Sequence, residues 1–340
     1  MKRRKKLTPR REGHLTTIII TRHTTFIIAF AILLFTFTAV FFSSFEDIRR
    51  MVYGVKPKVA LETRKVSGYL PDEVRRIVEI MADQERAAAK DAMLFKETGE
   101  LIPEEPGLDI DVDSTVDKVM KAKPGEIVKL SRIAIAPAVT TRHFDPVYRV
   151  NTTRQIMAFA INLAWGEEYL PSLFRGLREQ NIKVTFFIDG EWAEKFPDIV
   201  RYISAEGHEV ASHGYRHVHV ERMGESEIRK LISDNDKLLV NIGVTPSPLF
   251  APPYGECNST IVSAGASLGY TTIMWTIDTI DWNTKDSQKI LNRVIPKITP
   301  GAIILAHPTS SFLEAFPKIV DASREAGYGF MTISDLISSK

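Results

Sequence analysis

Histidines with a metal-binding spacing follow one of the chain's short apolar runs. Ser212-His213-Gly-Tyr-Arg-His217 places two histidines four residues apart, and His219 adds a third that we expect to face solvent. Two histidines at this spacing on one turn of chain can bind a single ion, for which zinc is the usual choice. Structural histidine pairs have the same spacing. The pattern alone therefore leaves a metal site and a structural pair as alternatives.

Two aspartates flanked by tryptophans follow another apolar run, in Trp275-Thr-Ile-Asp278-Thr-Ile-Asp281-Trp282. An aspartate can orient or charge a neighbouring histidine, and the faces of tryptophan rings stack on sugars. The segment therefore favours a carbohydrate site. A capped turn beside core tryptophans is the alternative.

A further histidine and a proline-rich loop complete the candidate groups. His307 follows the apolar run 302–305 closely, where it could act as a general acid or as a structural residue. The loop Ala251-Pro-Pro-Tyr254 follows a third run, and the backbone amides of such a rigid loop could bind an oxyanion. A plain structural turn is the alternative for the loop.

The elements that must position these groups alternate along the chain from residue 156 onward. Apolar runs over 157–163, 184–188 and 302–305 have the character of buried strands, and the stretches between them are amphipathic, including one helix expected over 192–206. Buried strands that alternate with helices predict a parallel sheet in an α/β fold. About seven strands favour a small, irregular (β/α) barrel, in which chemistry lies at the carboxyl ends of the strands.

Together these segments resemble the polysaccharide deacetylase family, also called the NodB-homology domain or carbohydrate esterase family 4. His213 and His217 are similar to its His-x-x-x-His metal motif, and Ala251 to Tyr254 resembles its Arg-x-Pro-Tyr motif. The remaining matches are Asp278 to Trp282 with Asp-x-x-Asp-Trp and Leu305 to His307 with Leu-x-His. The resemblance spans residues 151–340 and implies an N-deacetylase fold, a zinc or other divalent metal, and a cell-wall or chitin-like polysaccharide.

Three positions depart from the family pattern. The motif Thr-Phe-Asp-Asp-Gly falls on residues 160–164, so the resemblance puts Asn162 at the general base and Leu163 at the third metal ligand. An amide does not titrate near neutrality, and a leucine has no donor atom. Ala251 replaces the arginine that holds the base, and an arginine without its carboxylate would be a buried unpaired charge. These losses make family-type activity and firm metal binding doubtful.

The resemblance therefore supports two functions. The first is hydrolysis of N-acetyl groups, which are non-peptide carbon–nitrogen bonds, with a weak or absent metal. His307, paired with Asp281, would be the acid in that reaction. The second is a catalytically deficient, glycan-binding pseudoenzyme with a structural role in the wall or in sporulation. Sporulation is implied because 161–171 resembles the branch of the family found in endospore formers. In both, substrate contacts would come from Tyr254, Asp278 and Trp282, with Trp165 as a further candidate.

The N-terminal segment has the composition of a membrane anchor. Residues 1–25 hold eight basic side chains and one acid, whereas the remainder holds 36 basic against 41 acidic, so nucleic acid is not an expected partner. Residues 24–45 carry no charge and have the length of a bilayer-spanning helix. A cleaved signal peptide and a buried core helix are alternatives, but 39–43 offers no small-x-small cleavage site. The basic flank predicts a cytoplasmic N-terminus and a single-pass protein of the cell membrane with its C-terminal domain outside.

The predicted organisation is a basic tail over 1–23, an anchor over 24–45, a linker over 46–60, a small α+β membrane-proximal module over 61–142, and the deacetylase-like domain over 151–340. In the module, periodicity predicts a helix within 68–96, followed by a loop over 99–107. The phrases 108–116 and 123–125 resemble modules suspected of binding peptidoglycan, with a stalk or packing domain as the alternative. The lone Cys257 cannot form an internal disulfide.

Overall fold

The computed structural model describes residues 22–95 and 98–339, which form two compact units. One unit combines the described part of Met1–Ala87 with Leu108–Ile133, and the other combines Ala88–Gly107 with the described part of Ala134–Lys340. The predicted basic tail lies, up to residue 21, outside the described residues. The segment 88–107 thus groups with the C-terminal unit, although the sequence pattern placed it within the small module.

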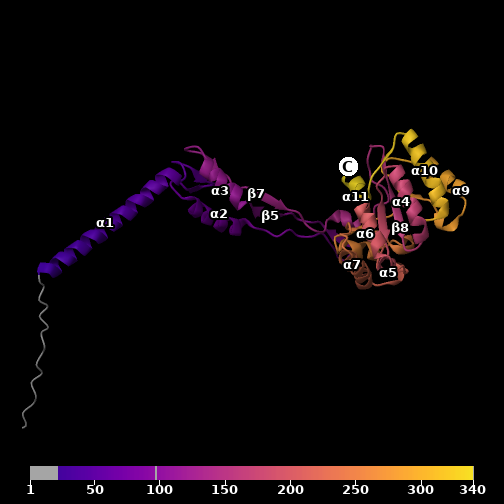
Figure 1. Ribbon diagram of the computed structural model, residues 1–340, viewed down its shortest axis with the longest axis horizontal. Coiled ribbons are helices and arrows are strands. Elements are labelled where there is room, and N and C mark those ends of the chain that lie inside the picture. The colour runs from indigo at the N-terminus through magenta and orange to yellow at the C-terminus, as the bar shows by residue number, and fades with distance from the viewer. Residues whose placement is uncertain (1–21, 96–97, 340) are drawn as a thin grey trace, which may run out of the picture. The chain divides into compact units, whose positions relative to one another are not determined.

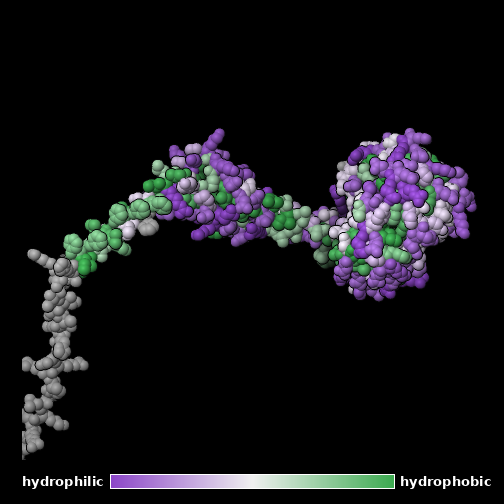
Figure 2. Space-filling model, in the orientation of Figure 1, coloured by the Kyte–Doolittle hydropathy of each residue, from purple (hydrophilic) through white to green (hydrophobic). Residues whose placement is uncertain are grey.

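The first unit begins with α1 (Arg22–Tyr53), a helix of 32 residues. Its apolar side chains are exposed, and Figure 2 shows hydrophobic colouring along it. Among the described residues this is the one helix long and apolar enough to cross a membrane, a test that a signal sequence also passes. The helix continues beyond the predicted anchor as far as Tyr53. In that extension Arg50 makes two 2.7 Å hydrogen bonds to Glu73.

The rest of the first unit is a small α+β module. Strands β1 (Ala60–Leu61), β2 (Arg64–Lys65) and β6 (Ile127–Val128) form a sheet in the order β2-β1-β6. Helices α2 (Pro71–Glu85) and α3 (Val112–Lys121) contribute apolar residues to one shared core. Proline at the first position of α2 suits a helix start, because its missing N–H would have no partner there.

The helix predicted within 68–96 ends early, at Glu85. Ala87 instead exchanges backbone hydrogen bonds with Leu108, which a continued helix would forgo. Strand β3 (Met93–Phe95) then pairs with β4 (Glu100–Ile102), so part of the predicted loop over 99–107 is a strand. The chain passes between the two units after Ala87, again within β5 (Gly107–Ile110), and a third time within β7 (Arg132–Ile135).

The second unit is built on a parallel sheet in the order β12-β11-β10-β9-β8-β14-β13, with β15 paired to β8. This confirms the predicted α/β fold with an irregular, open (β/α) barrel. Its strands are β8 (Ile156–Leu163), β9 (Thr185–Ile188), β10 (Glu209–Ser212), β11 (Leu249–Phe250), β12 (Thr271–Thr272), β13 (Ile277–Asp278), β14 (Ile303–Ala306) and β15 (Gly329–Phe330).

Helices pack around this sheet, several of which are labelled around β8 in Figure 1. They are α4 (Leu170–Glu179), α5 (Gly190–Lys195), α6 (Pro197–Ala205), α7 (Glu225–Ile242), α8 (Ser259–Ala266), α9 (Ser287–Val294), α10 (Ser310–Glu325) and α11 (Ile333–Ser338). The single helix predicted over 192–206 is wrong. Phe196 leaves the helical conformation at φ −129° and ψ 51°, and Pro197 starts a new helix because proline cannot continue one.

Alternate residues of β8 enter two different cores. One set packs with α4 and α10 and consists of Met157, Phe159, Ile161 and Leu163. The other set, Ala158 and Ala160, packs inside the barrel with Phe187 and Ala251. Because successive side chains of a strand point to opposite faces, Asn162 belongs to the interior set and Leu163 to the helix-facing set.

Candidate functional site

The carboxyl ends of the barrel strands bring the predicted groups together. A cavity of ≈ 470 Å³ lies there. Six of the predicted residues line it, namely Asn162, His217, Tyr254, Asp278, Trp282 and His307, and so does Trp165. The alternation of strands and helices predicted this edge correctly, because parallel strands all end on the same side. Trp275 and Leu305, which belong to the segments that the sequence singled out, also line the cavity, as does Gly255.

His213 is buried at the base of this edge, directly after β10, with 1% of its surface exposed. Its Nδ1 lies 2.7 Å from the carbonyl oxygen of Ala251, which fixes the ring and leaves Nε2 as the remaining nitrogen. Burial lowers the pKa of His213 to about 3, and the neighbouring His217 adds to this shift. Burial likewise lowers the pKa of His217. Both rings are therefore neutral at pH 7, the state in which imidazole binds metals.

Two histidines of the metal motif fit one ion, but the third ligand is missing. The ring centres of His213 and His217 lie 5.2 Å apart, and two imidazoles on one tetrahedral zinc have centres about 5 Å apart. Leu163 is fully buried in the helix-facing core and offers no donor. Within the described ranges, no three His, Cys, Asp or Glu side chains are placed to hold an ion. The donor set thus falls one short of a catalytic zinc site.

Asp189 is a buried carboxylate on the same edge that the sequence patterns did not single out. It follows β9, the strand between β8 and β10, and its N–H donates to the Leu163 carbonyl at 3.0 Å. Its Oδ1 accepts the Trp192 N–H at 3.0 Å and so caps α5, while its Oδ2 is buried without a hydrogen-bond partner. Burial raises the pKa of Asp189 to about 6. Asp189 forms no ion-binding group with the two histidines.

Asn162 and Ala251, at the positions where the family resemblance expects a base and its tether, carry neutral side chains. Asn162 is 6% exposed and lines the cavity, and its Oδ1 is buried without a hydrogen-bond partner in the described chain. An amide cannot take a proton from water near neutral pH. Ala251 is buried in the barrel core, where it contributes its backbone carbonyl to His213 rather than a side chain.

Asp281 and His307 form a hydrogen-bonded pair. Asp281 Oδ1 lies 2.9 Å from His307 Nδ1, and its Oδ2 accepts the backbone N–H of His307 at 2.7 Å. Thr309 donates its hydroxyl to the same Oδ2 at 3.3 Å, and the aspartate side chain is fully buried. Trp165 stacks on the histidine ring with centres 5.6 Å apart and planes 8° apart. Nε2 of His307 is therefore the nitrogen left for a ligand.

Aromatic side chains line the mouth of the cavity. Tyr254 and Trp282 are 56% and 57% exposed, as suits rings that stack on sugars. Tyr254 has a left-handed backbone at φ 58°, and a Cβ on Gly255 would lie 2.4 Å from the Trp275 ring, so this turn requires glycine there. His219 is exposed, as expected, but it also stacks on Tyr254 with ring centres 4.1 Å apart. Local sequence gave no sign of that contact.

Asp278 holds a turn at the rim of the cavity. Its Oδ1 accepts the N–H of Ile280 at 2.8 Å, and Ile280 has a left-handed backbone at φ 49°. The carboxylate also lines the cavity, so Asp278 both shapes the loop that carries Asp281 and remains within reach of a ligand.

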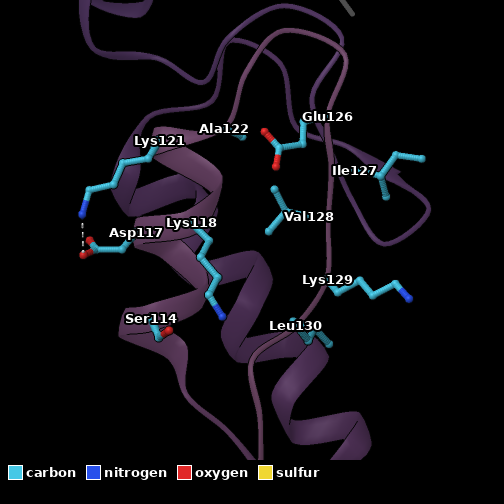
Figure 3. A pocket seen from close by; sticks show the side chains of 10 residues that line it. All are labelled: Ser114, Asp117, Lys118, Lys121, Ala122, Glu126, Ile127, Val128, Lys129 and Leu130. Carbon is cyan, nitrogen blue, oxygen red and sulfur yellow. Dashed lines mark hydrogen bonds and ion pairs between the residues drawn. The ribbon is translucent and has the colours of Figure 1, made fainter.

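A larger cavity of ≈ 670 Å³ lies in the small module, and Figure 3 shows the side chains around it. Its lining comes from α3 and from the segment that contains β6, with Lys118, Lys121 and Lys129 among the charged groups. Lys121 pairs with Asp117 at 3.3 Å, and Lys118 donates to Ser131 at 2.8 Å. No histidine is among the residues that line it. The groups that the sequence singled out for chemistry line the barrel cavity instead.

The parallel barrel, the histidine pair and the Asp281–His307 pair define a domain of the polysaccharide deacetylase class. A family model for polysaccharide deacetylases matches residues 149–273. A relative in Bacillus subtilis (strain 168), the uncharacterized protein YlxY, is 30% identical over 239 residues, which cover 69% of this chain and 75% of that protein. The chain thus belongs to the polysaccharide deacetylase family, the NodB-homology or carbohydrate esterase 4 family.

Other relatives include both active and inactive family members. A peptidoglycan-N-acetylglucosamine deacetylase of Bacillus cereus is 30% identical over 177 residues, which cover 51% of this chain and 64% of that protein. A carbohydrate esterase 4 pseudoenzyme from Bacillus anthracis is structurally similar, with a TM-score of 0.56 and 30% identity, over 77% of this chain and 94% of that one. A mutant of that pseudoenzyme with restored enzymatic activity has the same TM-score and 29% identity over 77% of this chain and 97% of that one.

Proposed function

We propose that this chain is a catalytically deficient member of its family that binds N-acetylated glycan of the cell wall, or a chitin-like polymer, without hydrolysing it at the family's rate. The observation that carries this proposal is the burial of Leu163 in the helix-facing core, at the position of the third metal ligand. Its neighbour Asn162 supports the same conclusion, because an amide replaces the base. The similarity to a solved pseudoenzyme of the family is in agreement.

The reaction that the site has lost can be stated in terms of protons. Hydrolysis of an acetamide needs a base that takes a proton from water and an acid that gives one to the leaving amine. His307, held by Asp281, keeps the acid role, and the position of the base carries the amide of Asn162. Loss of a general base alone costs about 10²- to 10⁴-fold in rate.

In this proposal the cavity is a glycan-binding groove. Tyr254 and Trp282 stack on sugar rings at its mouth, and Trp165, Asp278 and His307 contact the sugar from within. Support comes from the exposure of the two rim aromatics and from the lining of the cavity. The paired histidines would bind zinc or another divalent ion only weakly, since two ligands remain.

We further propose that α1 anchors the protein in the cell membrane as a single pass, with its N-terminus cytoplasmic and residues 61–142 and 151–340 outside. The exposed apolar surface of α1 and the basic residues that precede it support this topology. A structural role in the wall or in sporulation fits the resemblance of residues 161–171 to the sporulation-associated branch. Localisation of a C-terminally tagged chain, with protease added outside intact cells, tests the topology.

Residual N-deacetylation is the second candidate function. The 2.9 Å contact between Asp281 and His307 favours it, because the family's acid pair is kept in full. In this case water would be activated without the base that Asn162 replaces.

Acetate release distinguishes the two functions. The full chain, purified in mild detergent, is incubated with acetylated chito-oligomers and with peptidoglycan, with and without added zinc or cobalt. The proposal predicts binding of the oligomers and no acetate above the level of a His307→Ala variant. Acetate release that disappears in His307→Ala would establish hydrolysis and overturn the pseudoenzyme proposal.

A further inference from the structure

Tyr254 has a backbone conformation that bulky residues rarely adopt. Its φ of 58° and ψ of 4° lie in the left-handed region, although 56% of the residue is exposed to solvent. Backbone strain of this kind persists only where the surroundings fix the residue. Contacts made at the surface must therefore hold the Tyr254 ring where it lines the mouth of the cavity.

His219 lies flat on the Tyr254 ring. The two ring centres are 4.1 Å apart and the planes differ by 11°, whereas His217 meets the same ring at 65° with centres 4.4 Å apart. His219 belongs to the loop after β10 and Tyr254 to the loop after β11, so the stacking joins two loops of the barrel edge. The next residue, Val220, is fully buried in a core cluster with Phe250 and anchors His219.

Glu256 fixes the imidazole of His219. Its Oε1 lies 2.6 Å from Nδ1 of His219, and its Oε2 accepts the N–H of Glu221 at 2.9 Å. Hydrogen bonds to an ionised carboxylate are shorter and stronger than those between neutral groups. Both oxygens of Glu256 thus bind the loop that carries His219. Neither His219 nor Glu256 lines the barrel cavity, so a ligand in the cavity contacts Tyr254 and not the pair that holds it.

We propose that His219 and Glu256 are positioning residues, which hold the Tyr254 ring in the orientation that a bound sugar contacts. The inference rests on the glycan-binding function proposed above and deepens it, because it identifies residues that govern affinity without touching the ligand. A side chain that is already ordered loses less conformational freedom on binding, and a larger part of the contact energy then contributes to affinity.

A purely structural role of the pair makes a different prediction. If His219 and Glu256 only stabilise the two loops, their replacement lowers the melting temperature and leaves the affinity of the folded protein unchanged. If they act through Tyr254, the affinity falls, and this effect disappears once the Tyr254 ring is removed. Two residues that act through one contact have non-additive effects on the binding free energy.

The test measures binding of the β-1,4-linked tetramer of N-acetylglucosamine to the full chain in detergent by titration calorimetry. The variants are His219→Ala, His219→Phe, Tyr254→Ala and the double variant that combines both alanine substitutions. Glu256→Gln removes the charge that binds the imidazole. Glu325→Gln makes the same change at the exposed C-terminal end of α10, outside the cavity lining, and serves as the control. Thermal melting verifies that each variant is folded.

We expect Tyr254→Ala to weaken binding about tenfold, as the loss of one aromatic contact. His219→Ala should weaken it about three- to fivefold, because the Tyr254 ring is then no longer ordered before binding. His219→Phe keeps a flat ring in the stack and should stay within about twofold of the wild type. The double variant should match Tyr254→Ala within about twofold. Glu256→Gln should lose less than His219→Ala, and Glu325→Gln should bind like the wild type.

The possible failures of the proposal are distinguishable. Unchanged affinity in a folded His219→Ala variant refutes the positioning role and leaves glycan binding intact. A double variant that loses the full factors of both single variants refutes it as well, because His219 would then act independently of Tyr254. If His219→Ala does not fold, Glu256→Gln with and without Tyr254→Ala gives the same comparison. A wild type that does not bind the tetramer refutes the glycan-binding function itself, and the positioning role with it.

Discussion

The two halves of the barrel cavity differ in the hydrogen bonds that their side chains make within the protein. In the metal-and-base half, formed by Asn162, Leu163, Ala251 and the two histidines, the replaced side chains have no hydrogen bond to the described chain. In the acid half, formed by Asp281, His307 and Thr309, one carboxylate binds a ring, a backbone N–H and a hydroxyl. An aspartate without a metal would be a buried unpaired charge, whereas the Asp281 carboxylate is hydrogen-bonded by groups that also hold the loop. The polar side chain of Asn162 is thus unpaired within the described chain, whereas that of Asp281 takes part in holding the fold.

Restoring the metal-and-base half should produce the largest change. The triple variant Asn162→Asp, Leu163→Asp and Ala251→Arg returns base, ligand and tether, and we expect acetate release from chito-oligomers with added zinc to rise by at least about 10²-fold. Acetate is measured against the same variant carrying His307→Ala. A triple variant that binds zinc and stays inactive would show that the acid half is not competent, and the contrast between the halves would fail.

Leu163→Asp alone should destabilise the protein by about 3–5 kcal/mol in the absence of metal, because it places an unpaired carboxylate in the helix-facing core. Thermal and urea unfolding of the full chain in detergent measure the loss. Leu163→Met, which nearly conserves volume, should cost less than about 1.5 kcal/mol. A Leu163→Asp variant as stable as the wild type without metal would mean that the protein accommodates an unpaired carboxylate at position 163 without cost.

Acidic pH should lower the stability of the protein through His213, which belongs to the metal-and-base half. Its folded pKa of about 3 lies below the ordinary value of 6.5, so on acidification the unfolded ring takes a proton before the folded one does. Stability should therefore fall between pH 6.5 and about 3, at a limiting slope of about 1.4 kcal/mol per pH unit for this group. Urea midpoints of the wild type and His213→Gln over pH 7 to 4 give the difference.

His208 is a second buried histidine in the same unit, and its pKa is lowered to about 4. It therefore also lowers the stability of the protein as the pH falls. A His208→Gln variant separates the two contributions. If wild type and His213→Gln show the same slope, His213 is not held neutral by burial.

The smallest effect concerns the acid half. Asp281→Asn should lower stability by about 1–3 kcal/mol, because one of the two oxygens that accept the His307 and Thr309 groups becomes a donor. Asp278→Asn keeps the single acceptor that its turn uses and should change stability by less than about 0.5 kcal/mol. Equal, small losses for both variants would indicate that Asp281 has no structural role, and the two halves would then differ only in chemistry.

Much of the barrel and of its site could be predicted from local patterns. The apolar run over 157–163 identified β8, and the strand-end position of His213, Asp281 and His307 placed them on one edge. Pro197 indicates the break between α5 and α6, and the prediction of a single helix over 192–206 did not take it into account. The early end of α2 had no local signal, because pairing of Ala87 with Leu108 across the chain decides it. The contact of His213 with the Ala251 carbonyl could not be predicted from the sequence either, because the acceptor is a backbone atom that every residue type has.

The alternation of β8 also bears on how such a protein can change over generations. Asn162 and Leu163 are adjacent in sequence, yet one borders a solvent-accessible cavity and the other a dry core. A change at 162 alters ligand chemistry while leaving the apolar packing in place, so selection can test it in single steps. A substitution of Leu163 by aspartate gives a less stable protein unless a metal ion binds to the new carboxylate. Under the proposed function, the two positions therefore differ in how easily a single substitution restores aspartate, and position 163 is the harder of the two.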